Sequence, residues 1–256
     1  MLLTGATGGL GHAIARALAQ RGGQLVLTGR RAEVLDPLAT ELGARALAVD
    51  LAQPGEVERL LEEAGEVDVL VANAALPASG TLDTYTVEQI DRALAVNVRA
   101  PIVLSHGLVG SMVARGGGHL VFMSSLSGKV ASAGAALYNA SKYALRGFAS
   151  ALRADLHGSG VGVSAVFPGF IRDAGMFADA RVKLPPGVGT RSPEEVAAAV
   201  VDAIEHNRGE VDVAPLPLRA SAMLGSVAPE LAAGLARRLG AEEIGRRMGT
   251  AQRDKR

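Results

Sequence analysis

Tyr138 and Lys142 stand four residues apart in the segment YNASK. Residues at positions i and i+4 of a helix share a face, so the lysine ammonium would lie near the phenol. A free phenol, with a pKa of about 10, is only about 0.1% ionised at pH 7 and is a poor base. An adjacent cation would stabilise the phenolate and lower the pKa of Tyr138, which predicts acid–base chemistry at this residue. The alternative is a helix-surface pair or a half-buried tyrosine without a catalytic role.

A group of serines precedes this pair in the chain: Ser124, Ser125 and Ser127 follow the apolar run at residues 120–123. Open α/β sheets bind ligands outside the carboxyl ends of their strands, which is where these hydroxyls would lie. One of the three could therefore bind a polar group of a substrate beside Tyr138. The chemistry of a hydroxyl alone leaves open which one.

Residues 4–11 read TGATGGLG and connect a short apolar run to a segment with helical periodicity. A strand that enters a helix through a tight glycine turn points the first N–H groups of the helix at one spot, where they can bind a pyrophosphate. Gly5 and Gly9 would permit the turn and the close approach, and Gly11 would permit close packing of helix on strand. The alternative is a flexible turn without a ligand. The placement predicts a dinucleotide site, with contacts expected from the following residues of the turn: Gly5, Thr7, Gly8, Gly9 and Leu10.

The end of the second predicted strand indicates which dinucleotide fits. An acidic residue there would bind the ribose 2′-hydroxyl of NAD, whereas an arginine would pair with the 2′-phosphate of NADP. The chain reads Thr28-Gly29-Arg30-Arg31 and has no carboxylate at this point. Arg30, with Arg31 beside it, therefore favours NADP(H) over NAD(H), the alternative being two solvated arginines.

The glycine spacing of residues 5–11, together with the Tyr-x-x-x-Lys pair, resembles the short-chain dehydrogenase/reductase family over residues 1 to about 215. The resemblance implies an NADP-dependent enzyme that interconverts a carbonyl and a secondary alcohol. It also implies that Ser125 polarises the carbonyl and that Tyr138 donates the proton. Lys142 would tune the tyrosine and bind the nicotinamide ribose, and Asn97 would hold a water between the lysine and solvent.

Further cofactor contacts follow from the same resemblance. Asp50 and Leu51 look like the pair that meets the adenine ring, and Asn73-Ala74-Ala75 resembles the family's Asn-Ala-Gly element. After the sixth predicted strand, the resemblance implies contacts from Pro168, Gly169 and Ile171. Asp173 departs from the pattern, because the family usually has a threonine there that contacts the nicotinamide amide. An ionised aspartate can accept a hydrogen bond from that amide but cannot donate one.

The elements that must position these residues alternate along the chain. Short apolar runs predict seven strands, at residues 2–4, 24–28, 46–49, 67–72, 120–123, 161–167 and 210–213. Helical periodicity lies between them. A capping box is expected at Thr86-x-x-Gln89, and Ser192 is expected to cap a helix that has Pro193 at its first position. The pattern predicts a single α/β domain over residues 1–256, with a Rossmann-like, doubly wound, seven-stranded parallel sheet flanked by helices on both faces. A substrate lid is expected at about residues 173–191, and a helical extension at about 216–256.

Composition excludes several other classes of protein. The chain has no cysteine and equal numbers of acidic and basic residues, which argues against disulfide scaffolds, thiol nucleophiles and a nucleic-acid-binding domain. The histidines, at positions 12, 106, 119, 157 and 206, lack the spacing of metal ligands, so no metal site is expected. The first residues do not resemble a signal peptide, and glycines and charges interrupt every apolar run before about 20 residues. A cytoplasmic protein is expected.

Two partner questions stay open at this stage. The basic tail carries an apolar stripe at Leu231, Leu235, Leu239, Ile244 and Met248, which favours packing on the body or on another subunit over binding to a membrane. The family usually associates through the long helices that here begin near residues 86 and 135, which implies a homodimer or homotetramer. The expected ligand is a small apolar or amphipathic carbonyl compound. The alternative function is a redox sensor that binds NADP without turnover.

Overall fold

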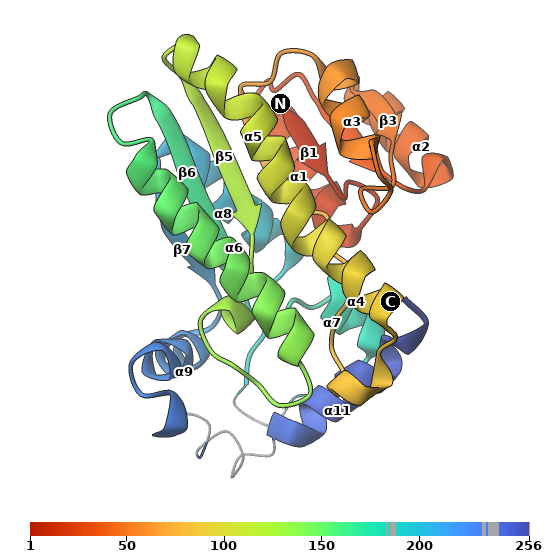
Figure 1. Cartoon of the computed structure of the whole chain (residues 1–256), viewed down its shortest axis with the longest axis vertical. Helices are drawn as coiled ribbons and strands as arrows, with labels where there is room; N and C mark the ends of the chain where they lie inside the picture. Colours follow the sequence, from red (N-terminus) through yellow and green to blue (C-terminus); the bar gives the residue numbers. More distant parts are fainter. Residues whose placement is uncertain (183, 185–187, 232–233, 235–240, 256) are drawn as a thin grey trace.

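The computed structural model describes residues 1–182, 184, 188–231, 234 and 241–255. In this part of the chain, seven parallel strands form one sheet in the order β3-β2-β1-β4-β5-β6-β7 (Figure 1). The strands are β1 (Leu2–Thr4), β2 (Val26–Gly29), β3 (Arg45–Ala48), β4 (Val69–Ala72), β5 (Gly118–Met123), β6 (Val161–Pro168) and β7 (Glu210–Val213). The predicted seven-stranded, doubly wound α/β fold is confirmed, with strand ends shifted by at most two residues.

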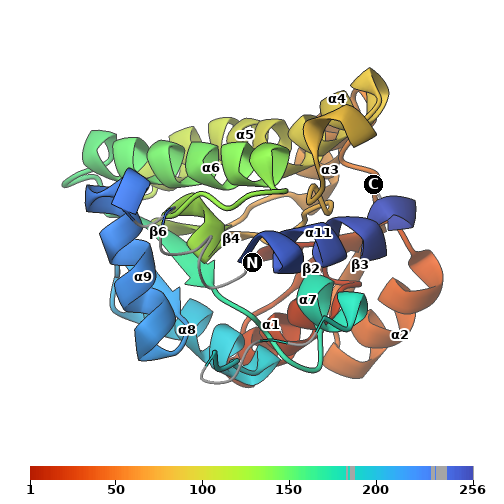
Figure 2. The same ribbon diagram turned by 90° about the horizontal axis from the view of Figure 1, so that it is seen from below.

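Helices cover both faces of the sheet (Figure 2). One layer consists of α1 (Gly9–Gln20), α2 (Ala32–Leu42) and α8 (Pro193–Glu205). The opposite layer consists of α3 (Glu56–Ala64), α4 (Val87–Leu94), α5 (Ala100–Ala114) and α6 (Ala136–Asp155). Three further helices, α7 (Gly175–Ala180), α9 (Leu216–Val227) and α11 (Ala241–Ala251), lie near the carboxyl ends of the strands.

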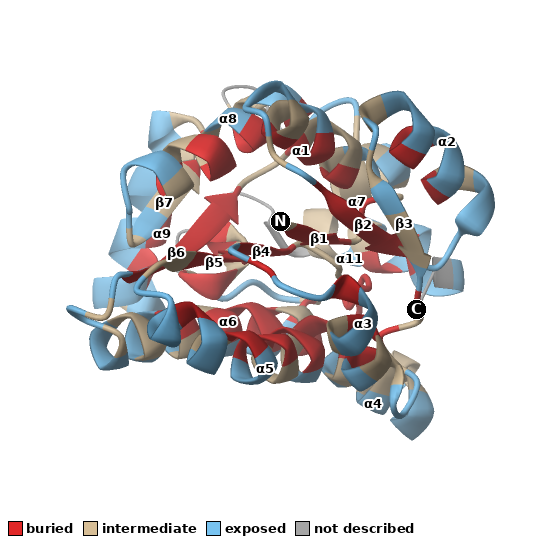
Figure 3. Ribbon diagram, turned by 90° about the horizontal axis from the view of Figure 1, so that it is seen from above, coloured by how far each residue is buried: buried red, intermediate tan, exposed pale blue. Residues whose placement is uncertain are grey.

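Alternation along the strands produces two separate cores. In β5, Leu120 and Phe122 pack against the α5 and α6 side, whereas Val121 and Met123 pack against the α1 and α8 side. All four side chains are buried, as they must be in a parallel strand covered on both faces. Figure 3 shows the buried sheet between helices whose inner faces are also buried. Burial on both faces fixes the register, because a one-residue slip would send every side chain to the opposite layer.

Residues 87–114 form a long apolar helical segment that by composition alone could be taken for a membrane-crossing helix. α4 and α5 are joined by a π-helical turn, Ala95–Arg99, and together reach the length and hydropathy of a membrane-crossing helix. The expected interruptions are present at Arg99, Gly107 and Gly110, but they do not lower the mean hydropathy enough to exclude such a helix by composition. In the fold this helix covers the sheet, with Leu104, Leu108 and Met112 buried in the core. A core helix therefore accounts for the same apolar composition.

The predicted capping box at Thr86 and the predicted cap at Ser192 are both present. Thr86 Oγ1 accepts from the Gln89 N–H at 3.3 Å, and Gln89 Oε1 accepts from the Thr86 N–H at 3.1 Å. Ser192 and Glu195 make the same reciprocal pair at the start of α8. Each box satisfies two amide groups that the first turn of a helix leaves without an acceptor.

Strand order places one special point in the sheet. The chain winds from β1 outward through β2 to β3, and then returns to the other side of β1 with β4. Helices that leave neighbouring strands β1 and β4 therefore cover opposite faces, and a crevice opens between them at the carboxyl ends. Open α/β sheets bind their ligands at this switch point.

Candidate active site

A cavity of 1160 Å³ lies at the carboxyl ends of the strands. It exceeds the roughly 300–1,000 Å³ of most small-ligand sites, so it has room for a dinucleotide and a second molecule. The predicted catalytic and cofactor residues that line it are Gly5, Thr7, Gly8, Gly9, Leu10, Arg30, Arg31, Asp50, Leu51, Asn73, Ala74, Ser125, Tyr138, Lys142, Pro168, Gly169 and Ile171. Asn97 is the predicted site residue that does not line this cavity.

The glycine turn has no space for side chains. Gly5 has a φ of 67°, and a Cβ there would lie 2.7 Å from the Cα of Ala74. A Cβ on Gly11 would lie 2.2 Å from the carbonyl oxygen of Gly5, so helix α1 packs directly on the turn, as expected for Gly11. At Gly9 the near neighbour is Ala174 Cβ, at 2.4 Å, so the segment that follows β6 lies against the turn. The first N–H groups of α1 therefore lie at the cavity, next to glycine backbone that has no side chains to cover it.

Asn73 holds this turn against the end of β4. Its Nδ2 donates to the carbonyl oxygens of Thr4 and Gly5, both at 3.1 Å. Thr4 Oγ1 in turn accepts from the N–H groups of Asn73 and Ala74, both at 3.0 Å. These bonds tie β1 to β4 across the switch point.

The arginines at the end of β2 lie beside the glycine turn. A Cβ on Gly29 would lie 2.7 Å from Thr7 Cγ2, so Thr7 packs on the glycine where another residue would hold a side chain. Arg31 donates to the carbonyl oxygen of Thr7 at 2.5 Å, and Arg30 is exposed at the cavity wall. Both arginines thus line the cavity beside the glycine turn, where a guanidinium group could pair with a phosphate.

Asp50 is fixed before any ligand arrives. Its Oδ2 lies 2.7 Å from Arg92 Nη2, and its Oδ1 accepts from the Ala52 N–H at 3.1 Å. Leu51 beside it is buried and lines the same cavity. The sequence analysis did not identify Arg92 as the partner of this carboxylate, because the two residues come from different layers.

Ser125 and Tyr138 form a hydrogen-bonded pair in the cavity. Ser125 Oγ accepts from the Ser127 N–H at 3.1 Å and donates to the carbonyl oxygen of Pro168 at 3.3 Å. Burial raises the pKa of Tyr138 above its ordinary value, and the hydrogen bond with Ser125 partly offsets that rise. Ser124, by contrast, donates to the carbonyl oxygen of Lys142 at 2.9 Å. Among the three candidate serines, Ser125 is therefore the one whose hydroxyl meets the phenol.

Lys142 does not act on the phenol as the sequence suggests. Its ammonium lies 5.7 Å from the centre of the Tyr138 ring and donates to the carbonyl oxygen of Met123 at 2.8 Å. Burial lowers the pKa of Lys142 to about 8, so the ammonium is still mostly protonated at pH 7. The expected lowering of the pKa of Tyr138 is wrong, because desolvation by burial raises this pKa. A protonated phenol at neutral pH suits a proton donor.

Asn97 lies in the π-helical turn between α4 and α5 and is fully buried. Its Oδ1 accepts from the Leu76 N–H at 2.7 Å, and its Nδ2 donates to the Leu76 carbonyl oxygen at 3.0 Å. Such turns project a side chain differently from the surrounding α-helix and are frequent at functional sites. Here the amide holds the chain that follows β4, and each polar atom keeps capacity for a second hydrogen bond.

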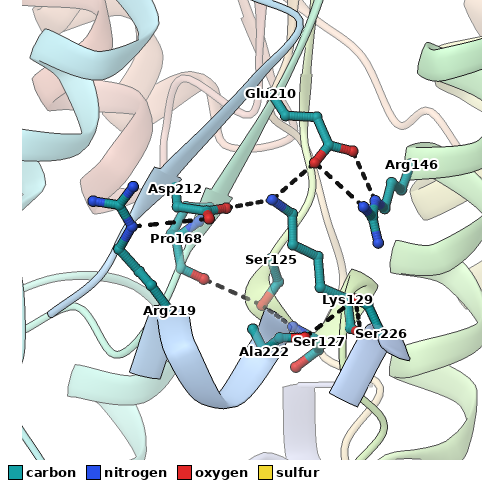
Figure 4. Close-up of polar contacts among 10 residues, drawn as sticks. All are labelled: Ser125, Ser127, Lys129, Arg146, Pro168, Glu210, Asp212, Arg219, Ala222 and Ser226. Atoms are coloured by element: carbon teal, nitrogen blue, oxygen red, sulfur yellow. Dashed lines mark hydrogen bonds and ion pairs between the residues drawn. The ribbon is translucent and has the colours of Figure 1, made fainter. Parts of the chain in front are cut away.

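The loop that carries Ser125 is tied to the far edge of the sheet through Lys129 (Figure 4). Lys129 Nζ lies 2.6 Å from Asp212 Oδ1 and 2.9 Å from Glu210 Oε2, both in β7. The same ammonium lies over the ring of Phe167, 4.0 Å from its centre. Ser226, in α9, donates to the Lys129 carbonyl oxygen at 3.0 Å. Sequence separation hid this contact, since the carboxylates follow Lys129 by more than 80 residues.

Part of the segment expected to form the lid is helical. α7 brings Met176 and Phe177 to the cavity, whereas Lys183, Pro185 and Pro186 lie outside the described residues. Asp173 has a φ of 67° and lines the cavity, with its carboxylate 3.4 Å from Arg172 Nε. Its exposed carboxylate faces the region expected for the nicotinamide and keeps free acceptor capacity.

Several cavity residues were not recognised as site residues in the sequence. Ile244, Gly245, Met248 and Gln252, from α11 and the residue just beyond it, line the same cavity as Tyr138. Of the apolar stripe of the tail, Ile244 and Met248 lie against the body at the cavity, as expected. The expectation is wrong for Leu231, which is 72% exposed, and Leu235 and Leu239 lie outside the described residues. Within the part of the chain that the structure describes, no group of three or more His, Cys, Asp or Glu side chains could hold a metal ion.

Comparisons with known proteins agree with this site. The family model for short chain dehydrogenases matches residues 1–184, well over half of the chain. A ketoacyl reductase, HetN, from Nostoc sp. is 36% identical over 230 residues, which cover 86% of this chain and 80% of the relative. Dehydrogenase/reductase SDR family member 7B from Bos taurus is 32% identical over 257 residues, covering 90% and 78% of the two chains.

Solved structures extend the comparison to three dimensions. A short-chain dehydrogenase from Sphingobium yanoikuyae in complex with NADPH superposes with a TM-score of 0.78 at 27% identity, covering 90% of this chain and 94% of the other. A putative β-ketoacyl-ACP reductase superposes with a TM-score of 0.76 at 29% identity, covering 83% and 95%. Fold, site geometry and sequence similarity agree, and the chain belongs to the short-chain dehydrogenase/reductase family of oxidoreductases.

Proposed function

We propose that this protein is an NADPH-dependent reductase that converts a carbonyl group into a secondary alcohol. One observation carries the proposal: a single cavity is lined by the Ser125–Tyr138 pair with buried Lys142 and also by Arg30 and Arg31. The serine–tyrosine end can bind and protonate a carbonyl oxygen. The arginine end can hold the phosphate that distinguishes NADP from NAD.

The residues of the chain fit the dinucleotide along its whole length. The open first turn of α1 and the unscreened backbone of the glycine turn suit a pyrophosphate. Arg30, assisted by Arg31, binds the 2′-phosphate, and Asp50 with Leu51 borders the adenine. Asn73 and Ala74 border the ribose side, and Pro168, Gly169 and Ile171 border the nicotinamide. Two structural relatives are described in complex with NADPH and with NADP⁺, which supports the proposed preference for NADP(H) over NAD(H).

The mechanism follows from the protonation states. Bound NADPH supplies the hydride that adds to the carbonyl carbon. Tyr138, which is neutral at pH 7 and whose pKa burial raises further, donates its proton to the carbonyl oxygen. Ser125 donates a hydrogen bond to the same oxygen and polarises it. Lys142 binds the nicotinamide ribose, and Asn97 uses its remaining hydrogen-bond capacity to hold a water that returns a proton toward the site.

The substrate we propose is a ketone with an apolar substituent, of which a 3-oxoacyl thioester is the leading example. Apolar side chains of α7 and α11 surround the serine–tyrosine end of the cavity. A ketoacyl reductase among the relatives and a putative β-ketoacyl-ACP reductase among the structural neighbours support this choice. We further propose a homodimer or homotetramer, because the outer faces of α5 and α6 expose Val113 and Tyr143.

A fluorescence titration with NADPH and NADH at matched salt tests the cofactor. We expect NADPH to bind at least about tenfold more tightly, equivalent to about 1.4 kcal/mol, and Arg30→Ala to abolish that difference. Arg208→Ala, a surface arginine paired with Asp202 away from the cavity, is the control. Oxidation of NADPH by a panel of ketones then tests catalysis. NADPH binding without any turnover would favour a redox sensor, and equal binding of both nucleotides would contradict the phosphate site.

A further inference from the structure

Helix α11 crosses the mouth of the cavity, although it lies outside the matched family segment. Figure 2 shows it running between α7 and the layer that contains α4 and α6, beneath the carboxyl ends of the strands. Residues 241–251 thus lie more than 100 positions from Tyr138 in the sequence, yet they line the same cavity. The family model ends at residue 184, so nothing in that match describes this helix.

Two glycines one turn apart set how closely α11 approaches. A Cβ on Gly245 would lie 2.3 Å from the carbonyl oxygen of Ala133, and a Cβ on Gly249 would lie 2.7 Å from the Cα of Gly80. The helix therefore rests directly on two backbone segments, which Gly80 and Gly134 join by an N–H to carbonyl bond of 2.6 Å. One of these segments follows β4, and the other precedes Tyr138. The glycine face of α11 holds the helix across both.

Helical geometry then decides which residues face the cavity. Ile244 and Met248 each precede a glycine of this face by one position, so they form an adjacent stripe about 100° around the helix. Both line the cavity, whereas Arg246 and Arg247 do not line it, are exposed, and pair with Glu243. The arrangement presents an apolar stripe to the ligand space and charges to solvent.

The far end of α11 is fastened to the lid helix. Gln252 is only 2% exposed, and its Nε2 donates to the carbonyl oxygen of Met176 at 3.2 Å. Met176 and Phe177 line the cavity next to the α11 stripe. The carboxyl-terminal helix and α7 therefore form one continuous cover over the serine–tyrosine end.

We propose that α11 is the roof of the substrate site, and that Ile244 and Met248 bind the apolar substituent of the carbonyl substrate and set its size. This inference rests on the proposed reductase function. It assigns substrate selection to a segment that does not touch the glycine turn or the arginine end. Size selectivity should therefore change independently of nucleotide affinity.

The test varies the volume of one roof residue. Met248→Trp fills the space and Met248→Ala enlarges it, with Arg247→Ala as the matched control on the exposed side. The probes are 3-oxoacyl thioesters of N-acetylcysteamine with acyl chains of increasing length. We expect Met248→Trp to lower kcat/KM for the longest acyl chain at least about tenfold more than for the shortest. Met248→Ala should shift the preference the other way, and the affinity for NADPH should stay unchanged in all three variants.

The Met248→Trp variant also reports occupancy without turnover, because the natural chain has no tryptophan. With NADP⁺ bound, butan-2-one cannot be reduced, and we expect it to shield Trp fluorescence from acrylamide about twofold. Arg247→Trp is the control and should show no shielding. If the protein reduces no thioester but shows this shielding, the proposed reductase function is refuted, whereas the proposal that α11 is the roof of the site is supported. Turnover with the same chain-length profile in every Met248 variant, or equal shielding at both positions, overturns the roof.

Discussion

Two lysines of this protein are almost completely buried, and their surroundings are opposite. Lys129 is 8% exposed and lies against two carboxylates of β7. Lys142 is 3% exposed, and its ammonium donates to the backbone carbonyl of Met123, with no ion pair to any described carboxylate. Burial is the same, but only Lys129 has its charge compensated.

The difference separates a structural cation from a functional one. A compensated ammonium such as that of Lys129 holds its two partners in place. An uncompensated ammonium costs free energy in the folded protein, and the pKa of Lys142 falls to about 8 in consequence. A residue with such a free-energy cost is retained when it has a function, such as binding a ligand that supplies hydrogen-bond partners for the ammonium. Replacing each lysine by methionine, which keeps most of its volume, should therefore give opposite results.

The largest effect is expected for Lys142→Met on turnover. Loss of the ammonium should lower kcat for ketone reduction about 10²- to 10⁴-fold, the range for a group that supports proton transfer. Lys129→Met should retain far more activity, because it lies behind the Ser125 loop and does not line the cavity. Steady-state kinetics with saturating NADPH measures both. Equal losses of kcat in the two variants would contradict the distinction.

For stability the order is reversed. Lys129→Met removes the buried cation that joins Glu210 to Asp212. Arg146 still pairs with Glu210 at 2.7 Å, and Arg219 lies 3.9 Å from Asp212, so we expect a destabilisation of about 3 kcal/mol. Urea unfolding at pH 7 measures this free energy. Lys129→Arg, which keeps the charge, is the control and should recover most of the loss. A Lys129→Met protein as stable as the natural one would mean that the ion pairs contribute nothing.

The pKa of Lys142 predicts how stability depends on pH. The unfolded chain holds a proton on this lysine up to pH 10.5, whereas the folded chain releases it near pH 8. The unfolded state therefore binds more protons between these values, and folding becomes more favourable as the pH rises through that window. Below pH 8 the buried charge costs roughly 3 kcal/mol, at about 1.4 kcal/mol for each pKa unit. Lys142→Met should be more stable than the natural protein by about this amount at pH 7.

This stability difference should shrink as the pH approaches 10.5. Unfolding of both proteins, without nucleotide, at a series of pH values provides the measurement, and other titrating groups cancel in the difference. A constant difference from pH 7 to pH 10.5 would show that Lys142 keeps an ordinary pKa in the folded state.

The contrast also shows how far the sequence could predict the site. The strands and the cavity residues near the glycine turn were predictable, because alternation, helical periodicity and short motifs are local properties. The role of Lys129 was not, since its partners Glu210 and Asp212 come from a strand at the sheet edge. The raised pKa of Tyr138 was missed for a related reason, because burial is a property of the assembled layers.

The carboxyl-terminal helix shows the same limit more strongly. Gly245 and Gly249 are not distinctive in a chain with 32 glycines. Their packing role becomes evident only in the fold, where they lie against Ala133 and Gly80. The apolar stripe of the tail predicted that it packs on something. The spacing of the apolar residues in this stripe did not indicate that the surface they pack on would be the mouth of the cavity.

The smallest effect, and the sharpest one for the comparison, is expected for Asp212→Asn. Lys129 would keep Glu210 as a charged partner and gain a neutral hydrogen-bond acceptor of the same shape, so we expect a loss of only about 1–2 kcal/mol. Adding Lys129→Met to this variant should cost less than in the natural protein, since the ion pair between Lys129 and Asp212 is already absent. A double-mutant cycle by urea unfolding measures the coupling. Strict additivity would mean that Lys129 and Asp212 do not act as a pair, and the contrast with Lys142 would then rest on Glu210 alone.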